Sequence, residues 1–115
     1  MQDNLRLIDL FNSSINRSIK WKKYFPIYEN LFEKYRNKEI TFVEIGVLDG
    51  GSLEIWKKYF GKKSRIIGVD NNPQCKKFEN SDCEIHIGSQ SDPLFWTNFY
   101  KQIGNVDIIL DDGGH

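Results

Sequence analysis

Short hydrophobic runs alternate with segments of mixed, helix-spaced residues along most of the chain. Four runs are rich in β-branched and aromatic side chains, a composition typical of buried strands; they cover residues 40–45, 65–69, 84–87 and 106–110. The segments between them carry apolar residues at helical spacing or open with a proline that suits a first helical turn; they cover residues 52–60, 73–80 and 93–103. Strands that alternate with helices predict an α/β fold, a Rossmann-like three-layer sandwich with a parallel sheet and right-handed crossovers.

The first part of the chain is predicted to be helical. Pro26 suits the first turn of a helix that we expect to run to about residue 37. Its apolar face is expected to consist of Tyr28, Leu31, Phe32 and Tyr35. We therefore divide the chain into an N-terminal helical segment, residues 1–38, and an α/β half-domain, residues 39–115.

Composition and charge are those of a small folded domain. Hydrophobic residues make up 39% of the sequence and aromatic residues 14%, which suffices for a core. Sixteen basic residues balance sixteen acidic ones, so nothing in the charge points to nucleic acid or a membrane surface. With no signal peptide and no long apolar run, we expect a cytoplasmic protein. Cys75 and Cys83 lack C-x-x-C spacing and are expected to be reduced, partly buried thiols.

The centre of the chain, residues 41–52, has the pattern of a strand, a glycine-rich turn and the start of a helix. Gly46, Gly50 and Gly51 permit positive φ and a close approach of the backbone to a ligand. Ser52 is expected to cap the following helix. A strand–glycine loop–helix unit is where open α/β sheets bind nucleotide-like cofactors, although the loop alone is equally consistent with an ordinary turn.

Two residues of this unit bear on which cofactor it binds. Leu48 stands where the dinucleotide fingerprint needs its second glycine for the pyrophosphate. Glu44 places a carboxylate beside the loop, where it would repel phosphate and attract a cation. S-adenosylmethionine (SAM) has an ammonium, a sulfonium and no phosphate, so it fits this loop better than NAD does.

A second signal follows at the end of the next strand. Asp70 lies about as far after Gly46 as the acid that binds ribose hydroxyls in doubly wound sheets. The glycine loop and Asp70 together favour a nucleotide-type site much more strongly than either feature alone. His86, which alternates with Ile85 and Ile87, is interpreted as an outward-facing strand residue rather than a ligand.

The last predicted helix has clear end signals. Asp92 is expected to cap it, with Pro93 in the first position and Gly104 after its end. Phe95, Phe99 and Ile103 repeat on one face.

These motifs, taken in order, resemble the class I SAM-dependent methyltransferases. More narrowly, they resemble the branch that contains macrolide-sugar O-methyltransferases and cephalosporin-hydroxylase-type proteins. The resemblance covers residues 20–115 and rests on Lys20-Trp21 with Tyr24-Phe25, Glu44–Val47 with Gly50–Ser52, Gly68–Asp70 with Pro73, Gly88–Asp92, and Asp107 with Asp111–His115.

The resemblance implies a role for each candidate residue. The methionine end of SAM would lie against Glu44, Gly46, Gly50, Gly51 and Ser52. Asp70 would bind the ribose hydroxyls, Gln90 would lie beside the adenine, and Asp111 would belong to the same cofactor site. Asp112 would be a ligand of a divalent metal, usually magnesium, which prefers hard oxygen ligands. His115 would be the general base that removes the proton of a sugar hydroxyl, a role that suits a histidine of near-neutral pKa.

The same resemblance predicts an incomplete sheet. The family's sheet has seven strands, and this sequence supplies four, expected in the order 3-2-1-4. Ser89 also stands where the family has an aspartate. We therefore expect the chain to be the N-terminal, cofactor-binding part of a longer enzyme, inactive alone and a possible homo-oligomer, whose acceptor is a small molecule or glycan. The alternatives are a non-catalytic nucleoside- or SAM-binding module and, disfavoured by Leu48 and Glu44, the half-domain of an NAD-type oxidoreductase.

Overall fold

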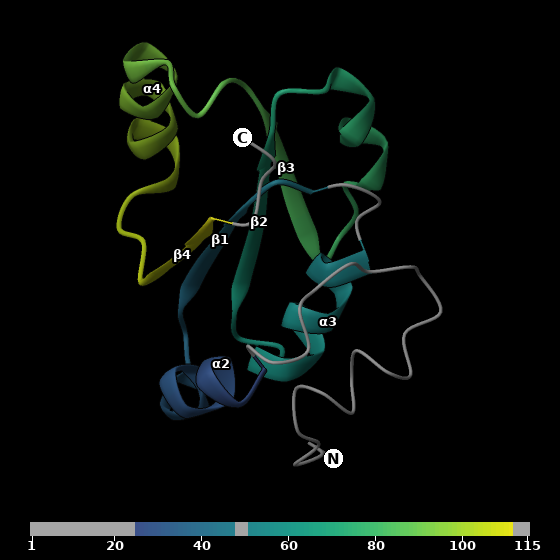
Figure 1. The fold of residues 1–115 in the computed structure, drawn as a ribbon, viewed down its shortest axis with the longest axis vertical. Helices are drawn as coiled ribbons and strands as arrows, with labels where there is room; N and C mark the ends of the chain where they lie inside the picture. Colours follow the sequence, from purple (N-terminus) through teal and green to yellow (C-terminus); the bar gives the residue numbers. More distant parts are fainter. Residues whose placement is uncertain (1–24, 48–50, 112–115) are drawn as a thin grey trace.

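The computed structural model describes residues 25–47 and 51–111. These form strands and helices in alternation, as Figure 1 shows. The elements are α2 (Phe25–Phe32), the 3₁₀ helix η2 (Glu33–Tyr35), β1 (Thr41–Ile45), α3 (Gly51–Phe60), β2 (Arg65–Asp70), the 3₁₀ helix η3 (Pro73–Phe78), β3 (Cys83–Ile87), α4 (Pro93–Ile103) and β4 (Ile108–Asp111). The predicted α/β fold is confirmed.

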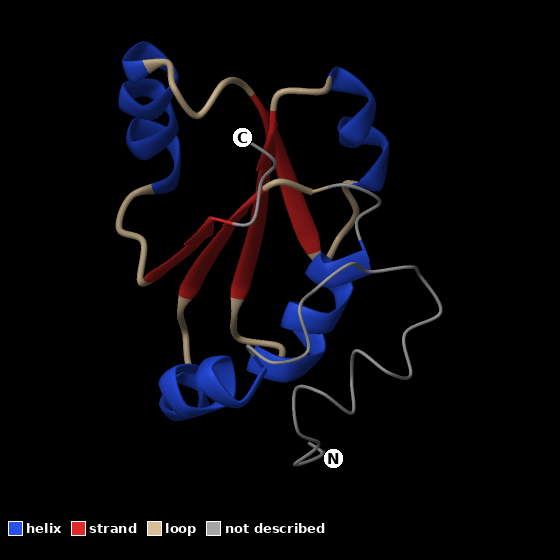
Figure 2. Ribbon diagram, in the orientation of Figure 1, coloured by secondary structure: helices blue, strands red, loops and turns tan. Residues whose placement is uncertain are grey.

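The four strands make one parallel sheet in the order β3-β2-β1-β4, which confirms the predicted order (Figure 2). Val43 of β1 is the partner of Ile67 in β2 and of Ile109 in β4. β1 and β2 are thus the two interior strands, and their carboxyl ends lie side by side. Doubly wound sheets bind ligands at the carboxyl ends of neighbouring strands.

Each face of the sheet has its own hydrophobic cluster, so the fold has three layers. On one face Phe42 and Ile66 pack with Trp56 of α3. On the other face Val43, Ile67 and Val69 pack with residues of α4, Phe99 and Ile103. Side chains along a strand point alternately to opposite faces, so β1 and β2 bury residues on both sides, as parallel strands normally do.

The helix before β1 is shorter than predicted. α2 ends at Phe32, continues as η2 to Tyr35, and is followed by Asn37, whose φ is 62° and whose N–H donates to the Phe60 carbonyl oxygen at 2.7 Å. This turn directs the chain into β1. Phe32 is buried in the core, but Leu31 is 54% exposed, so its predicted place on the apolar face is wrong.

Most other element boundaries differ from prediction by one or two residues. The expected helix at residues 73–80 is the 3₁₀ helix η3, and β4 begins at Ile108 rather than at residue 106. At Asp107 a side-chain carboxylate, rather than a backbone carbonyl, accepts from the Thr41 N–H at 2.8 Å, and regular pairing of β4 with β1 begins at the next residue. The cap at Asp92, Pro93 at the helix start and Gly104 after its end are confirmed.

Other predictions concerned the two cysteines, membrane-spanning segments, the division of the chain and its location in the cell. Cys75 and Cys83 are free, as predicted, and both are buried. Within the described ranges no helix has the length and apolar character needed to cross a bilayer. The boundary between residues 38 and 39 and the cytoplasmic location stay predictions.

Candidate cofactor-binding cleft

A cleft of about 290 Å³ opens at the carboxyl ends of β1 and β2 and is closed on a third side by the segment after β3. Its described lining is mostly polar and consists of Ile45, Gly46, Val69, Asp70, Asn71, Gly88, Ser89, Gln90 and Ser91. Three of the predicted cofactor-binding residues, Gly46, Asp70 and Gln90, therefore lie together in one cleft.

Gly46 forms the first wall, where the chain leaves β1. Its φ is 95°, a conformation that a side chain would strain. The backbone N–H of Gly46 donates to the Val69 carbonyl oxygen at 2.8 Å. The glycine thus turns the chain sharply while the turn stays attached to the end of β2.

Asp70 forms the second wall and accepts hydrogen bonds from two backbone amides. Its Oδ2 accepts from the Val47 N–H at 2.8 Å, and its Oδ1 accepts from the Asn72 N–H at 2.9 Å. The thiol of buried Cys75 lies against the same carboxylate. Burial, followed by the charge of Asp70 and the hydrogen bond to it, raises the pKa of the Cys75 thiol. Asp70 therefore links the turns that follow β1 and β2.

The third wall, residues 88–91, is held in place by α4 and β2. The Gly88 N–H donates to the Asp70 carbonyl oxygen at 2.9 Å, and a Cβ on Gly88 would come within 2.1 Å of the Phe95 ring. The indole Nε1 of Trp96 donates to the Gln90 carbonyl oxygen at 2.7 Å. Because α4 fixes this backbone, the edge of the cleft beside Gln90 has a defined position.

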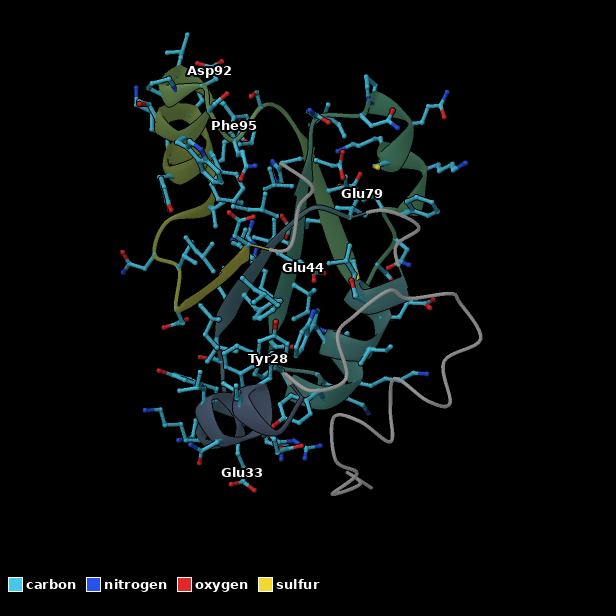
Figure 3. The ribbon with its side chains drawn as sticks, viewed as in Figure 1. Tyr28, Glu33, Glu44, Glu79, Asp92 and Phe95 are labelled. Atoms are coloured by element: carbon cyan, nitrogen blue, oxygen red, sulfur yellow. The ribbon has the colours of Figure 1, made fainter. Side chains whose placement is uncertain are left out.

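Glu44 and Ser52 are hydrogen-bonded to each other and are not part of the described lining of the cleft. Glu44 is fully buried in β1, and its Oε1 accepts from the Ser52 Oγ at 2.5 Å; Figure 3 shows Glu44 in the middle of the sheet. Neither residue is among the described residues that line the cleft. The predicted cap at Ser52 is wrong, because α3 already begins at Gly51 and the Ser52 hydroxyl is bonded to Glu44 instead.

His86 is also less exposed than predicted. Its ring packs edge-on against Phe99 of α4, with centroids 5.2 Å apart, and its Nε2 lies 3.6 Å from Glu84 Oε1. The side chain is therefore half-buried under α4. Buried and less buried residues alternate at the start of β3, as predicted, but α4 covers the face of the sheet that carries His86.

The remaining predicted site residues do not line the described cleft or lie outside the described residues. Gly51 is buried at the start of α3, and Asp111 is exposed at the end of β4; neither lines the described cleft. Gly50, Asp112 and His115 lie outside the described residues. Within the described ranges no three potential metal ligands of the His, Cys, Asp or Glu type come together.

Several residues of the cleft were not predicted from the sequence. Asn71 and Ser91 line it, and Trp96 supports it from α4. The run Asp70-Asn71-Asn72-Pro73 does carry a signal for a turn. An aspartate side chain often accepts from the backbone amide two residues later and so forms a turn, as Asp70 does with the Asn72 N–H. No local pattern relates Trp96 to the Gln90 backbone.

Known proteins were compared with the chain by sequence and by structure. No family model matches it. The chain is 36% identical over 109 residues to 8-demethyl-8-alpha-L-rhamnosyl tetracenomycin-C 2'-O-methyltransferase of Streptomyces olivaceus. It is 33% identical to demethylmacrocin O-methyltransferase of Streptomyces fradiae over 105 residues, and 33% identical to mycinamicin VI 2''-O-methyltransferase of Micromonospora griseorubida over 99 residues. These matches cover 80–85% of this chain but only 24–28% of the relatives.

A solved structure is similar over nearly the whole chain. The methyltransferase MycE of the mycinamycin biosynthetic pathway, in complex with Mg, SAH and mycinamycin VI, superposes with a TM-score of 0.86 at 27% identity. The match covers 99% of this chain and 33% of the MycE chain. The four-stranded sheet thus corresponds to part of a methyltransferase fold.

Proposed function

Because this chain is a relative of the macrolide-sugar O-methyltransferases, which belong to the class I SAM-dependent methyltransferases, we propose that it is the cofactor-binding part of such an enzyme. The observation that carries the proposal is the cleft at the carboxyl ends of β1 and β2, with Asp70 in its wall. This is the position at which open α/β sheets bind nucleotide-like ligands.

The chemistry of the cleft fits an adenosyl cofactor. Each carboxylate oxygen has two lone pairs, so Asp70 can accept from ribose hydroxyls in addition to the two amides. Gly46 allows backbone to approach a ligand closely, and Gln90 offers amide groups to an adenine edge. No lysine or arginine is among the described lining residues, which favours a ligand without phosphate.

The other proposed cofactor contacts follow from the family resemblance alone. Glu44, Gly50, Gly51, Ser52 and Asp111 would hold the methionine end or its surroundings. Glu44 is fully buried and accepts a hydrogen bond from Ser52, so its carboxylate is held against the start of α3. A buried carboxylate of this kind can also act by holding the start of α3 in place.

The chemistry proposed for the whole enzyme is methyl transfer to oxygen. Bound SAM would supply an electrophilic methyl group on its sulfonium. The acceptor hydroxyl oxygen would form a bond to that methyl carbon as the carbon–sulfur bond breaks, with the electron pair staying on sulfur. His115 would accept the hydroxyl proton. A sugar hydroxyl is the proposed acceptor, because the named relatives methylate sugars.

The proposal includes a magnesium ion. The MycE structure contains Mg. Asp112 is the proposed ligand here, but it lies outside the described residues. The chain spans about a quarter of the length of the curated relatives, so further ligands and the acceptor site would come from the rest of an enzyme of that length.

Calorimetric titration with S-adenosylhomocysteine and, separately, with NAD tests the proposal. We expect binding of S-adenosylhomocysteine and none of NAD. Asp70→Ala should weaken binding by about 1–3 kcal/mol, the cost of leaving bound hydroxyls without their charged partner. Asp82→Asn is the control, because it removes one exposed negative charge from the turn before β3 and leaves the cleft intact. Binding of NAD in place of S-adenosylhomocysteine would favour the oxidoreductase alternative and refute this proposal.

A further inference from the structure

The loop that follows β1 is attached to β2 at two consecutive amides. Gly46 N–H donates to the Val69 carbonyl oxygen, and Val47 N–H donates to the Asp70 carboxylate, each at 2.8 Å. The last two residues of β2 therefore determine the path of the chain as it leaves β1. The first of these bonds is to backbone and is indifferent to sequence, whereas the second depends on the Asp70 side chain.

Asp70 is itself held by donors from three segments. Val47 follows β1, Asn72 follows β2, and Cys75 belongs to η3. Val47 is 1% exposed and Cys75 is 5% exposed, so two of the three donors lie where water does not compete freely. A carboxylate has about four lone-pair positions, and three donors leave at least one for a ligand in the cleft. Holding the loop and binding a ligand are therefore compatible.

We propose that Asp70 is a positioning residue for the chain as it leaves β1, in addition to any direct contact that it makes with a ribose. Its carboxylate holds the Val47 amide, and with it the turn at Gly46, independently of a bound ligand. The contribution of Asp70 to ligand binding thus has two parts, and one of them does not involve ribose hydroxyls. The ligand part of this inference rests on the proposed function, whereas the loop part does not.

Amide hydrogen exchange in the ligand-free chain tests the loop part. Asp70→Ala is expected to speed exchange of the Val47 amide by about tenfold or more, as for loss of a hydrogen bond to a charged group. Asp82→Asn, which removes a charge at an exposed position, should leave that amide unchanged. Asp70→Asn, which retains one acceptor, provides a milder substitution should the alanine variant unfold. Unchanged Val47 exchange in a folded Asp70 variant would overturn the proposal.

Cys75 provides a matched pair of variants. Cys75→Ala removes the third donor to Asp70, and Cys75→Ser keeps a donor of similar size. We expect faster exchange at Val47 in the alanine variant, by a smaller factor than in Asp70→Ala, and slower exchange again in the serine variant. Equal exchange in the two variants would show that Cys75 takes no part in holding Asp70.

Calorimetry with two ligands separates the two parts of the role of Asp70. The ligands are S-adenosylhomocysteine and its analogue without the 2′- and 3′-hydroxyls. If Asp70 positions the loop, Asp70→Ala lowers affinity for the analogue as well, by about threefold to tenfold. If the analogue binds both proteins equally, Asp70 affects ligand binding only through the ribose, and the ligand part of the proposal is refuted. If neither ligand binds the wild-type chain, the proposed function fails, and the exchange experiment still decides the loop role.

Discussion

The two edges of the sheet differ in what covers their backbone. At the β3 edge, the Lys76 ammonium donates to the Ile85 carbonyl oxygen at 2.7 Å, and the Glu79 carboxylate accepts from the Ile85 N–H at 3.0 Å. Asn80 does the same for Cys83: its N–H donates to the Cys83 carbonyl oxygen, and its side-chain oxygen accepts from the Cys83 N–H at 3.1 Å. Side chains and backbone of the segment before β3 thus occupy the place of a neighbouring strand.

The β4 edge has no such cover within the described ranges, where β4 is the last strand of the sheet on that side. Ile109 of β4 is 46% exposed, whereas Ile85 of β3 is fully buried. Exposed strand edges are templates for pairing with another chain, and proteins blunt them with charged side chains or covering segments. Among the described residues, the backbone at the β3 edge is therefore covered and the backbone at the β4 edge is not.

The largest expected difference between the edges is in their contribution to stability. Ile85→Ala should lower the free energy of unfolding by about 2–5 kcal/mol, because it leaves a cavity in the core. Ile109→Ala should lower it by less than about 1 kcal/mol, because its side chain is half-exposed. Urea denaturation of the two variants measures both values. Equal losses would contradict the distinction between the edges.

Self-association is the second expected difference. We predict that the 115-residue chain associates through β4 and shows no methyl transfer. Ile109→Lys should weaken that association at least about tenfold, roughly 1.4 kcal/mol, by placing a charge on the edge strand. Sedimentation velocity measures the mass of both proteins, with Lys77→Ala, at an exposed position of η3, as the control. A monomeric wild-type chain that transfers methyl groups would refute the prediction.

A smaller loss of stability is expected when one of the hydrogen bonds that cover the β3 edge is removed. Lys76→Ala should cost about 0.5–1 kcal/mol, toward the low end because the Lys76 side chain is 55% exposed. It should also increase self-association, since the Ile85 carbonyl loses its partner. Chemical denaturation and sedimentation of the variant measure the two effects. No change in either would mean that the Lys76 bond does not protect the edge.

Low pH should weaken the hydrogen bond between Glu79 and the Ile85 N–H at the β3 edge. The hydrogen bond from the Ile85 N–H, followed by the one from Lys76, lowers the pKa of Glu79 below its ordinary value. A depressed pKa means that the stabilisation is present above the ordinary glutamate pKa of about 4.3 and is lost as pH falls through the lower, folded-state value. Exchange of the Ile85 amide, corrected for intrinsic rates, should rise in that range. In Glu79→Gln this pH dependence should be absent, and its persistence would remove Glu79 as the cause.

The sequence predicted those features that local patterns determine. Asp92-Pro93 and Gly104 mark the ends of α4 because a cap, a fixed φ and a positive φ are properties of single residues. The strand order followed from alternating strands and helices, together with the family resemblance. Gly46, Asp70 and Gln90 meet in one cleft because the carboxyl ends of β1 and β2, and the segment after β3, lie at the same end of the sheet.

What the sequence did not predict depends on tertiary contacts. Glu44 was expected beside the loop, and nothing in the sequence indicates that this carboxylate is fully buried and bonded to the Ser52 hydroxyl of α3. Leu31 has helical spacing with Tyr28 and Tyr35 yet lies outside the core. The covering of the β3 edge by Lys76 and Glu79 involves residues six to nine positions before Ile85, and no periodicity records it.

The central claim is that the cleft between β1, β2 and residues 88–91 binds an adenosyl cofactor. Titration of the ¹⁵N-labelled chain with S-adenosylhomocysteine, followed by its amide resonances, tests this claim most directly. We predict saturable shifts at Gly46, Asp70 and Gln90, with none at Lys38 and Lys62, which precede β1 and β2 at the opposite end of the sheet. Saturable shifts confined to residues outside the cleft, or no shifts at any ligand concentration, would contradict it.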